Sequence, residues 1–197
     1  MTEEQFAQIM ALGHETTGVE FKGPGSRQSK AILAGVVRAV LGMANRRDGG
    51  LVIVGVDESG GTPVPRGLTS EDLATWEQEA MTGALAAYAD PYVEVHTEFF
   101  GYMGKALVII TVEEFREVPV LCKRDFEPKL RAGACYVRRR GRIETSEIPT
   151  QAEMRELLEL ATEKRLRSFL RQAQGAGLAV RAEPSSADLF DNELGEF

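Results

Sequence analysis

A buried strand that follows directly on a long helix is the feature that most constrains this fold. Residues Gln28–Ala44 repeat apolar side chains at helical spacing, which predicts an amphipathic helix. Asp48-Gly49-Gly50 then ends that helix, and Leu51–Val56 is a β-branched run typical of a strand buried inside a sheet. The chain therefore needs a sheet with helical cover.

The other segments mix helices and strands without strict alternation. Helices are expected over Glu3–Leu12 and from about Gln151 to Gln172. A further helix is expected to start after Thr69 or Ser70, whose hydroxyl can cap it, and to run to about Tyr88. Strands are expected over Val19–Lys22, Tyr92–Phe99, Lys105–Val112, Val118–Cys122 and Cys135–Arg139. The apolar run Lys105–Val112 predicts a central strand. This order indicates an α+β fold with a mixed β-sheet flanked by helices.

The domain is expected to occupy residues 1–172, with its core at about 15–160. A C-terminal helix leads into a flexible acidic tail over residues 173–197, where the apolar pattern fades. Cys122 and Cys135 are too few for a disulfide framework and indicate a reduced, cytoplasmic protein. The apolar runs are too short to cross a bilayer, and no basic segment precedes the first apolar residues, so neither a membrane nor a secretory signal is expected.

Charge is distributed unevenly along the chain. The formal net charge is −7, but Lys123–Arg142 holds eight basic and two acidic residues, which gives that segment +6 and the remainder −13. Two interpretations stay open: a solvated strand edge guarded against aggregation, or a strip that binds phosphates. Because side chains alternate along a strand, only some of residues 138–140 share a face. The basic residues of the strip are Lys123, Arg124, Lys129, Arg131, Arg138, Arg139, Arg140 and Arg142.

Acidic residues gather near two of the expected strands. Glu20 and Lys22 are two apart on one strand and so share a face, and Glu15 lies one loop earlier. Asp57 and Glu58 follow the buried strand. Converging carboxylates favour a divalent cation such as Mg²⁺ or Mn²⁺, and a lysine beside them could neutralise a phosphate. The alternative is a solvent-face ion pair and an ordinary turn.

Other chemistries have little support in the sequence. His14 and His96 have no partner at metal-ligand spacing, so no zinc site is expected. Neither cysteine has the setting of a catalytic nucleophile. The segment Gly23-Pro24-Gly25-Ser26 lacks the spacing of a Walker phosphate loop.

Several short motifs together resemble the AlbA-like domain of the Schlafen family, of the microbial type. They are Glu15-x4-Glu20-Phe21-Lys22, Met43-Ala44-Asn45 and the stretch from Gly49-Gly50 to Asp57-Glu58. Pro119-Val120, Tyr136-Val137-Arg138 and Ser146-Glu147-Ile148 also fit. The resemblance covers roughly Glu15 to Leu160.

The resemblance implies an α+β domain that in animals pairs two lobes and cuts structured RNA such as tRNA. Two Glu and one Asp form the metal-dependent nuclease site of those proteins. By motif position the metal ligands here would be Glu15, Glu20 and Glu58, with Asp57 also matching, and Lys22 would neutralise the phosphate. Glu58 stands where that family has Asp. The zinc-binding cluster of animal members has no counterpart.

The leading hypothesis is therefore a nucleic-acid-binding domain that cleaves RNA with a divalent metal, its basic strip following the RNA or DNA backbone. A homodimer is expected because animal members pair two lobes. One alternative is a non-catalytic DNA-binding or ATP-binding regulatory module, in which the carboxylates serve the structure. Another is a protein-interaction subunit whose acidic tail engages a basic partner.

Overall fold

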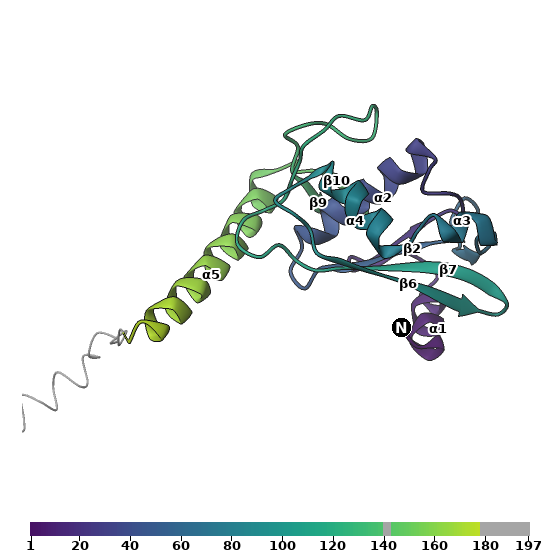
Figure 1. Cartoon of the computed structure of the whole chain (residues 1–197), viewed down its shortest axis with the longest axis horizontal. Coiled ribbons are helices and arrows are strands. Elements are labelled where there is room, and N and C mark those ends of the chain that lie inside the picture. The colour runs from purple at the N-terminus through teal and green to yellow at the C-terminus, as the bar shows by residue number, and fades with distance from the viewer. Residues whose placement is uncertain (140–142, 178–197) are drawn as a thin grey trace, which may run out of the picture. The chain divides into compact units, whose positions relative to one another are not determined.

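A computed structural model describes residues 1–139 and 143–177 of the chain (Figure 1). The chain divides into two units, Met1–Ala161 and Thr162–Phe197. The first unit holds the main sheet and the helices that cover it. The predicted α+β class with a mixed sheet is confirmed.

The main sheet has four strands in the order β1 (Val19–Lys22), β2 (Gly50–Val54), β7 (Lys105–Val112) and β6 (Val95–Tyr102). β1 and β2 run parallel, whereas β7 is antiparallel to both β2 and β6. The predicted central place of Lys105–Val112 is confirmed, because β7 lies between β2 and β6. Side chains alternate across this sheet, so each strand serves both faces.

Helices cover both faces of the main sheet (Figure 1). α2 (Lys30–Ala44) packs Val36, Val40 and Leu41 against the face that carries Val52 and Ile110. α1 (Glu3–Ala11) covers the opposite face with Phe6, which packs with Phe21, Ile53 and Ile109. Phe21 thus points toward α1, so its neighbours Glu20 and Lys22 point to the α2 face.

Short paired strands surround the main sheet. They are β3 (Val56–Asp57) with β4 (Val64–Pro65), β5 (Ala89–Asp90) with β8 (Leu121–Cys122), and β9 (Tyr136–Arg138) with β10 (Thr145–Glu147). The predicted strand Leu51–Val56 is interrupted at Gly55, whose φ of 106° only glycine adopts readily. Residues Val56 and Asp57 therefore pair with β4, outside the main sheet.

The helix expected from residue 69 or 70 to about 88 is two helices, α3 (Ser70–Ala74) and α4 (Gln78–Ala86). Trp76 lies between them, fully buried, and its indole N–H donates to the Gly25 carbonyl at 2.9 Å. This tertiary contact interrupts the helix between Ala74 and Gln78. Thr69 caps α3 by accepting the Asp72 N–H, which confirms one of the two predicted cap positions.

Asn45, directly after α2, fixes the position of β9. Its amide donates to the carbonyls of Val120 and Tyr136 at 2.8 and 2.9 Å, and its oxygen accepts the Val120 N–H. The chain continues from β10 into α5 (Gln151–Gly175). Cys122 and Cys135 are both free thiols. Across the described ranges, no helix combines the length and apolarity needed to span a membrane.

Candidate functional site

The acidic residues singled out near β1 do come together. Glu20 and Lys22 share a face as predicted, and Lys22 Nζ lies 2.5 Å from Glu20 Oε1. Glu15 folds back beside them, and its Oε1 accepts the Phe21 N–H at 2.7 Å. Strand alternation sets the first contact, and the turn before β1 sets the second.

Arg138 on β9 is the cation that joins these carboxylates. Its Nη1 lies 2.8 Å from Glu20 Oε2, and its Nη2 lies 2.6 Å from Glu15 Oε2. Nη2 also donates to the carbonyls of Thr16 and Val19 at 3.1 and 3.0 Å. The Arg138 side chain is only 1% exposed. We call Glu15, Glu20 and Arg138 the carboxylate–arginine node.

Thr145 completes the node from β10, where it lies opposite Arg138 in the strand pair. Its hydroxyl donates to Glu20 Oε2 at 2.7 Å. Gly42 of α2 makes room for this side chain, since a β-carbon there would lie 2.6 Å from Thr145 Cγ2. Each oxygen of Glu15 and Glu20 therefore accepts at least one hydrogen bond. The alternative that Glu20 and Lys22 form a solvent-face pair is wrong, because Glu20 is 6% exposed.

Glu58 and Asp57 have different surroundings. Asp57 Oδ1 accepts the Ser59 N–H at 3.0 Å, and Arg66 lies 3.5 Å from Oδ2; both interactions lower the pKa of Asp57. Burial, followed by the charge of Glu15 and a hydrogen bond with it, raises the pKa of Glu58 to about 7. Glu58 is thus the acid that faces the node, whereas Asp57, at the end of β3, bonds the turn that follows it.

The arrangement does not fit the expected Mg²⁺ or Mn²⁺ ion. Within residues 1–139 and 143–177, no three His, Cys, Asp or Glu side chains are arranged to hold a metal. The physical reason lies in the contacts above: Arg138 already bonds one oxygen of Glu15 and one of Glu20. An ion between these two carboxylates would have to displace the guanidinium.

The basic strip separates into buried and exposed members. Arg138 lies in the node, so its guanidinium is not available to a phosphate in this arrangement. Arg139 is three-quarters buried and pairs with Glu144 and Glu153 at 3.4 and 3.6 Å. Arg140 and Arg142 fall outside the described residues. The other four, which we call the basic loop, are Lys123, Arg124, Lys129 and Arg131.

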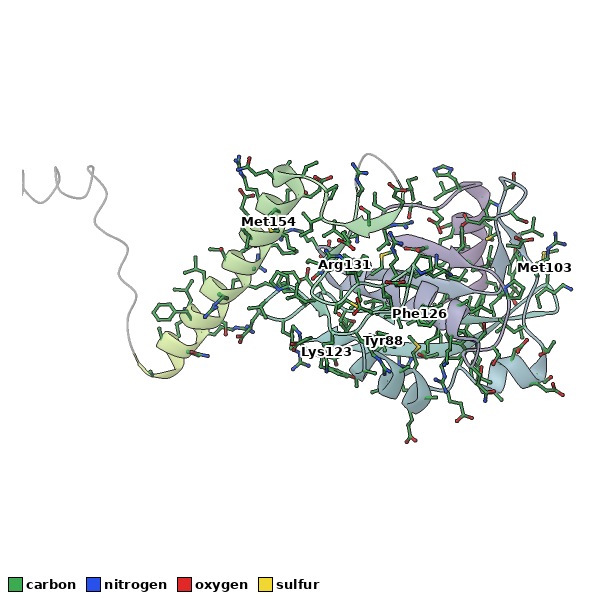
Figure 2. The ribbon with its side chains drawn as sticks, turned by 90° about the horizontal axis from the view of Figure 1, so that it is seen from above. Tyr88, Met103, Lys123, Phe126, Arg131 and Met154 are labelled. Atoms are coloured by element: carbon green, nitrogen blue, oxygen red, sulfur yellow. The ribbon has the colours of Figure 1, made fainter. Side chains whose placement is uncertain are left out.

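Within the basic loop, Lys123, Arg124 and Arg131 are exposed and Lys129 is half-buried (Figure 2 labels Lys123 and Arg131). Lys123 Nζ donates to the Ala86 carbonyl at 3.0 Å. Arg131 forms a two-pronged pair with Glu147, and that glutamate has a lowered pKa as a result. These contacts involve solvent-facing groups, which can exchange partners at little cost.

Lys129 brings the basic loop close to the node. Its Nζ donates to the Ala31 carbonyl of α2 at 2.8 Å. A β-carbon placed on Gly35 would lie 3.3 Å from Lys129 Nζ and 4.0 Å from Lys22 Cδ. The two lysines therefore flank the same glycine, Lys129 from the loop and Lys22 from β1 beside the node.

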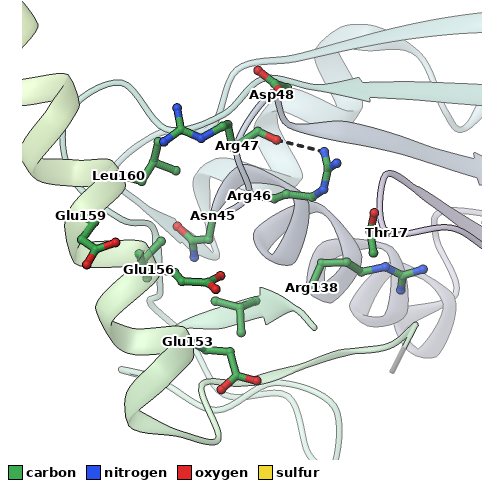
Figure 3. A pocket seen from close by; sticks show the side chains of 12 residues that line it. Thr17, Asn45, Arg46, Arg47, Asp48, Arg138, Glu153, Glu156, Glu159 and Leu160 are labelled. Atoms are coloured by element: carbon green, nitrogen blue, oxygen red, sulfur yellow. Dashed lines mark hydrogen bonds between the residues drawn. The ribbon is translucent and has the colours of Figure 1, made fainter. Parts of the chain in front are cut away.

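A polar cavity of about 490 Å³ lies between the end of α2 and the first turns of α5 (Figure 3). Arg46, Arg47 and Arg138 contribute to its wall, and so do the α5 carboxylates Glu153, Glu156 and Glu159. Arg46 Nη1 donates to the Arg47 and Gly49 carbonyls at 3.0 and 2.6 Å, closing the turn after α2. The wall of the cavity carries both positive and negative side chains, so the cavity favours neither anions nor cations.

The sequence alone missed the roles of Arg138 and Thr145. Both lie on short strands after residue 135, more than 115 positions from Glu20, so no local spacing connects them with it. The available signal was the alternation at Tyr136-Val137-Arg138, which places the arginine on the same side as a buried tyrosine.

A family model described as Schlafen, AlbA_2 matches residues 15–147. No curated protein matches the chain significantly. Among solved structures, the DIP2311 protein from Corynebacterium diphtheriae is 18% identical with a TM-score of 0.47; the match covers 74% of this chain and 26% of that one. The N-terminal domain of a RecG-related protein from Nitrosomonas europaea is 21% identical with a TM-score of 0.49, over 76% of this chain and 94% of that one. The chain thus spans about a quarter of the DIP2311 protein.

Proposed function

Since the chain belongs to the Schlafen AlbA_2 family, we propose that it is a nucleic-acid-binding domain whose phosphate contacts come from the basic loop. The observation that carries this proposal is the exposure of Lys123, Arg124 and Arg131 on one connected segment. The remaining basic residues whose side chains are described within Lys123–Arg142 are half-buried or buried.

Electrostatics make this loop the favoured phosphate contact. Nucleic-acid affinity comes largely from cations that release counterions at the phosphates. The chain has a net charge of −7, so its acidic surfaces repel phosphates that miss the loop. Lys129 and Lys22 flank Gly35, which offers a bound backbone a path from the loop to the edge of the node.

The test is a salt titration of binding to tRNA, single-stranded RNA and duplex DNA, measured by fluorescence anisotropy. A variant with glutamine at Lys123, Arg124, Lys129 and Arg131 should bind more weakly. For each phosphate that the variant no longer neutralises, the slope of log K against log salt should become shallower by about 0.7 on single strands and about 0.9 on B-DNA. The matched control is Arg116→Gln, because Arg116 is exposed and lies outside the loop. Equal affinities and slopes for wild type and the loop variant would overturn the proposal.

A second candidate function is metal-dependent cleavage of structured RNA such as tRNA. The observation that favours it is the gathering of Glu15, Glu20, Glu58 and Lys22 at one site. A bound Mg²⁺ or Mn²⁺ would supply water activation and charge stabilisation at the phosphate. The contacts of Arg138 with both Glu15 and Glu20 stand against it, because they occupy the oxygens such an ion would need.

A cleavage assay on tRNA with Mn²⁺ separates the two candidates. Glu58→Gln is the informative variant, because Glu58 faces the site without bonding Arg138. Cleavage by wild type that is lost in Glu58→Gln would support the enzyme. Binding without cleavage by wild type would support the nucleic-acid-binding domain instead. The homodimer, ATP binding and cytoplasmic location also remain predictions, and light scattering in solution tests the first.

A further inference from the structure

Four oxygens converge on the end of the Arg138 side chain. Nη2 is held by Glu15 Oε2 and by the carbonyls of Thr16 and Val19, at 2.6, 3.1 and 3.0 Å. Nη1 is held by Glu20 Oε2 at 2.8 Å. Two carboxylate and two carbonyl oxygens form an acceptor set of the kind that also binds hard divalent cations.

Contacts that do not involve the carboxylates set the position of the Arg138 main chain. β9 pairs with β10, where Arg138 lies opposite Thr145. Asn45 fixes the Tyr136 carbonyl two residues before Arg138. Arg138 Nε is buried without a partner, a cost that the charge-assisted contacts at Nη1 and Nη2 offset.

The two carboxylates need a cation here. Glu15 and Glu20 are largely buried, and two carboxylates that share a site repel each other unless a positive charge separates them. Of these two carboxylates, Lys22 contacts that of Glu20, at Oε1. Arg138 is the side chain that bonds both.

We infer that Arg138 is a built-in cation, which takes the place of a divalent metal between Glu15 and Glu20. The node is then complete without metal, and the carboxylates hold β1 to β9. Removal of the guanidinium leaves the acceptor oxygens without a cation and turns the node into a metal site. This inference does not depend on nucleic-acid binding by the basic loop.

The test compares wild type with Arg138→Ala in the full chain, using Mn²⁺ and Mg²⁺ as the probes. Thermal unfolding is followed with and without each ion, and EDTA reverses the addition. Wild type should be indifferent to the ions. The melting temperature of Arg138→Ala should rise with the logarithm of Mn²⁺ concentration, because an ion that binds only the folded state stabilises it by mass action.

Two controls make the result specific. Arg116→Ala removes an arginine that pairs with a single exposed carboxylate, and it should show no response to Mn²⁺. The double variant with Arg138→Ala and Glu20→Gln should lose the response, because one carboxylate ligand is gone. If Arg138→Ala does not fold without metal, circular dichroism on addition of Mn²⁺ gives the same readout, with recovery of structure as the expected result.

Two outcomes would overturn the inference. One is a wild type that Mn²⁺ stabilises and whose response disappears in Glu20→Gln, because the metal would then bind despite Arg138. The other is an Arg138→Ala chain, folded or unfolded, that does not respond to either ion. The anisotropy measurements on the basic loop are read separately, so neither outcome is confused with a failure of nucleic-acid binding.

Discussion

The carboxylate–arginine node and the basic loop contain the same kind of ion pair in opposite surroundings. In the node, the Arg138 side chain is 1% exposed and bonds two carboxylates and two carbonyls. In the loop, the Arg131 side chain is 63% exposed and pairs with Glu147 alone. Water screens the second pair and hardly reaches the first. Node charges should therefore determine stability, whereas loop charges should determine what the protein binds.

The largest expected effect is the loss of the buried cation. Arg138→Met removes the cation that Glu15 and Glu20 share and leaves Lys22 beside Glu20, which should lower the free energy of unfolding by about 3–5 kcal/mol. Urea unfolding at neutral pH, without divalent ions, measures the loss. Arg131→Met is the matched control and should cost at most about 1 kcal/mol. Equal losses for the two variants would contradict the contrast between the regions.

A smaller loss is expected from the neutral donor of the node. Thr145→Val keeps the shape of the side chain but removes the hydroxyl that donates to Glu20 Oε2. Glu20 Oε2 keeps its contact with Arg138 Nη1, so the loss is that of one hydrogen bond to a charged group, about 1.5–3 kcal/mol, and the same urea experiment measures it. Thr82→Val serves as control, because its hydroxyl contacts the exposed Gln78, and it should stay within about 0.5 kcal/mol. A Thr145 variant as stable as wild type would mean that Glu20 is satisfied without this hydroxyl.

The sequence predicted the part of the node that depends on local periodicity. Glu20 and Lys22 share a face because side chains alternate along a strand, and Phe21 is correspondingly in the core on the α1 side. Spacing could not predict Arg138, because its contact with Glu20 spans 118 positions of the chain. Interpreting Lys123–Arg142 as a phosphate-binding strip groups Arg138 with exposed cations, whereas alternation along β9 places it on the side of the buried Tyr136.

The same limit of local patterns explains where the predicted secondary structure is wrong. The Leu51–Val56 run reads as one strand because its β-branched residues are continuous, yet the conformation of Gly55 divides it. One helix was expected across residues 70–88, and burial of Trp76 against the Gly25 loop divides that segment too. In both cases a tertiary contact or a single backbone angle outweighs a regular local pattern.

Glu58 and Asp57 are adjacent acids in different surroundings, and each should make a different contribution to the pH dependence of stability. The folded-state pKa of Glu58 is raised to about 7, so its ionisation is less favourable in the fold than in the unfolded chain. This cost appears as pH rises from the ordinary glutamate range to about 7 and persists above it. Glu58→Gln should therefore unfold at higher urea than wild type at pH 8, with the difference vanishing near pH 4.

Asp57→Asn is the control of opposite sign. The pKa of Asp57 is lowered by the Ser59 N–H and then by Arg66, so its carboxylate stabilises the fold above the ordinary aspartate range, and that contribution disappears as pH falls. The asparagine variant should be slightly less stable than wild type at pH 8. Both effects should be smaller than that of Thr145→Val, because solvent screens these two side chains. Effects of the same sign would show that Glu58 does not face Glu15.

The smallest effect on stability is expected from the basic loop, where a near-zero result carries the argument. Lys123→Gln with Arg124→Gln removes two exposed cations that contribute no buried contact, so the free energy of unfolding should change by less than about 0.5 kcal/mol. The same double variant should weaken nucleic-acid binding and flatten its salt dependence. Urea unfolding and fluorescence anisotropy, measured on the same preparation, test the expected stability and the expected loss of binding. If affinity and stability fall together, the loop acts through the fold, and the separation of a structural node from a binding loop fails.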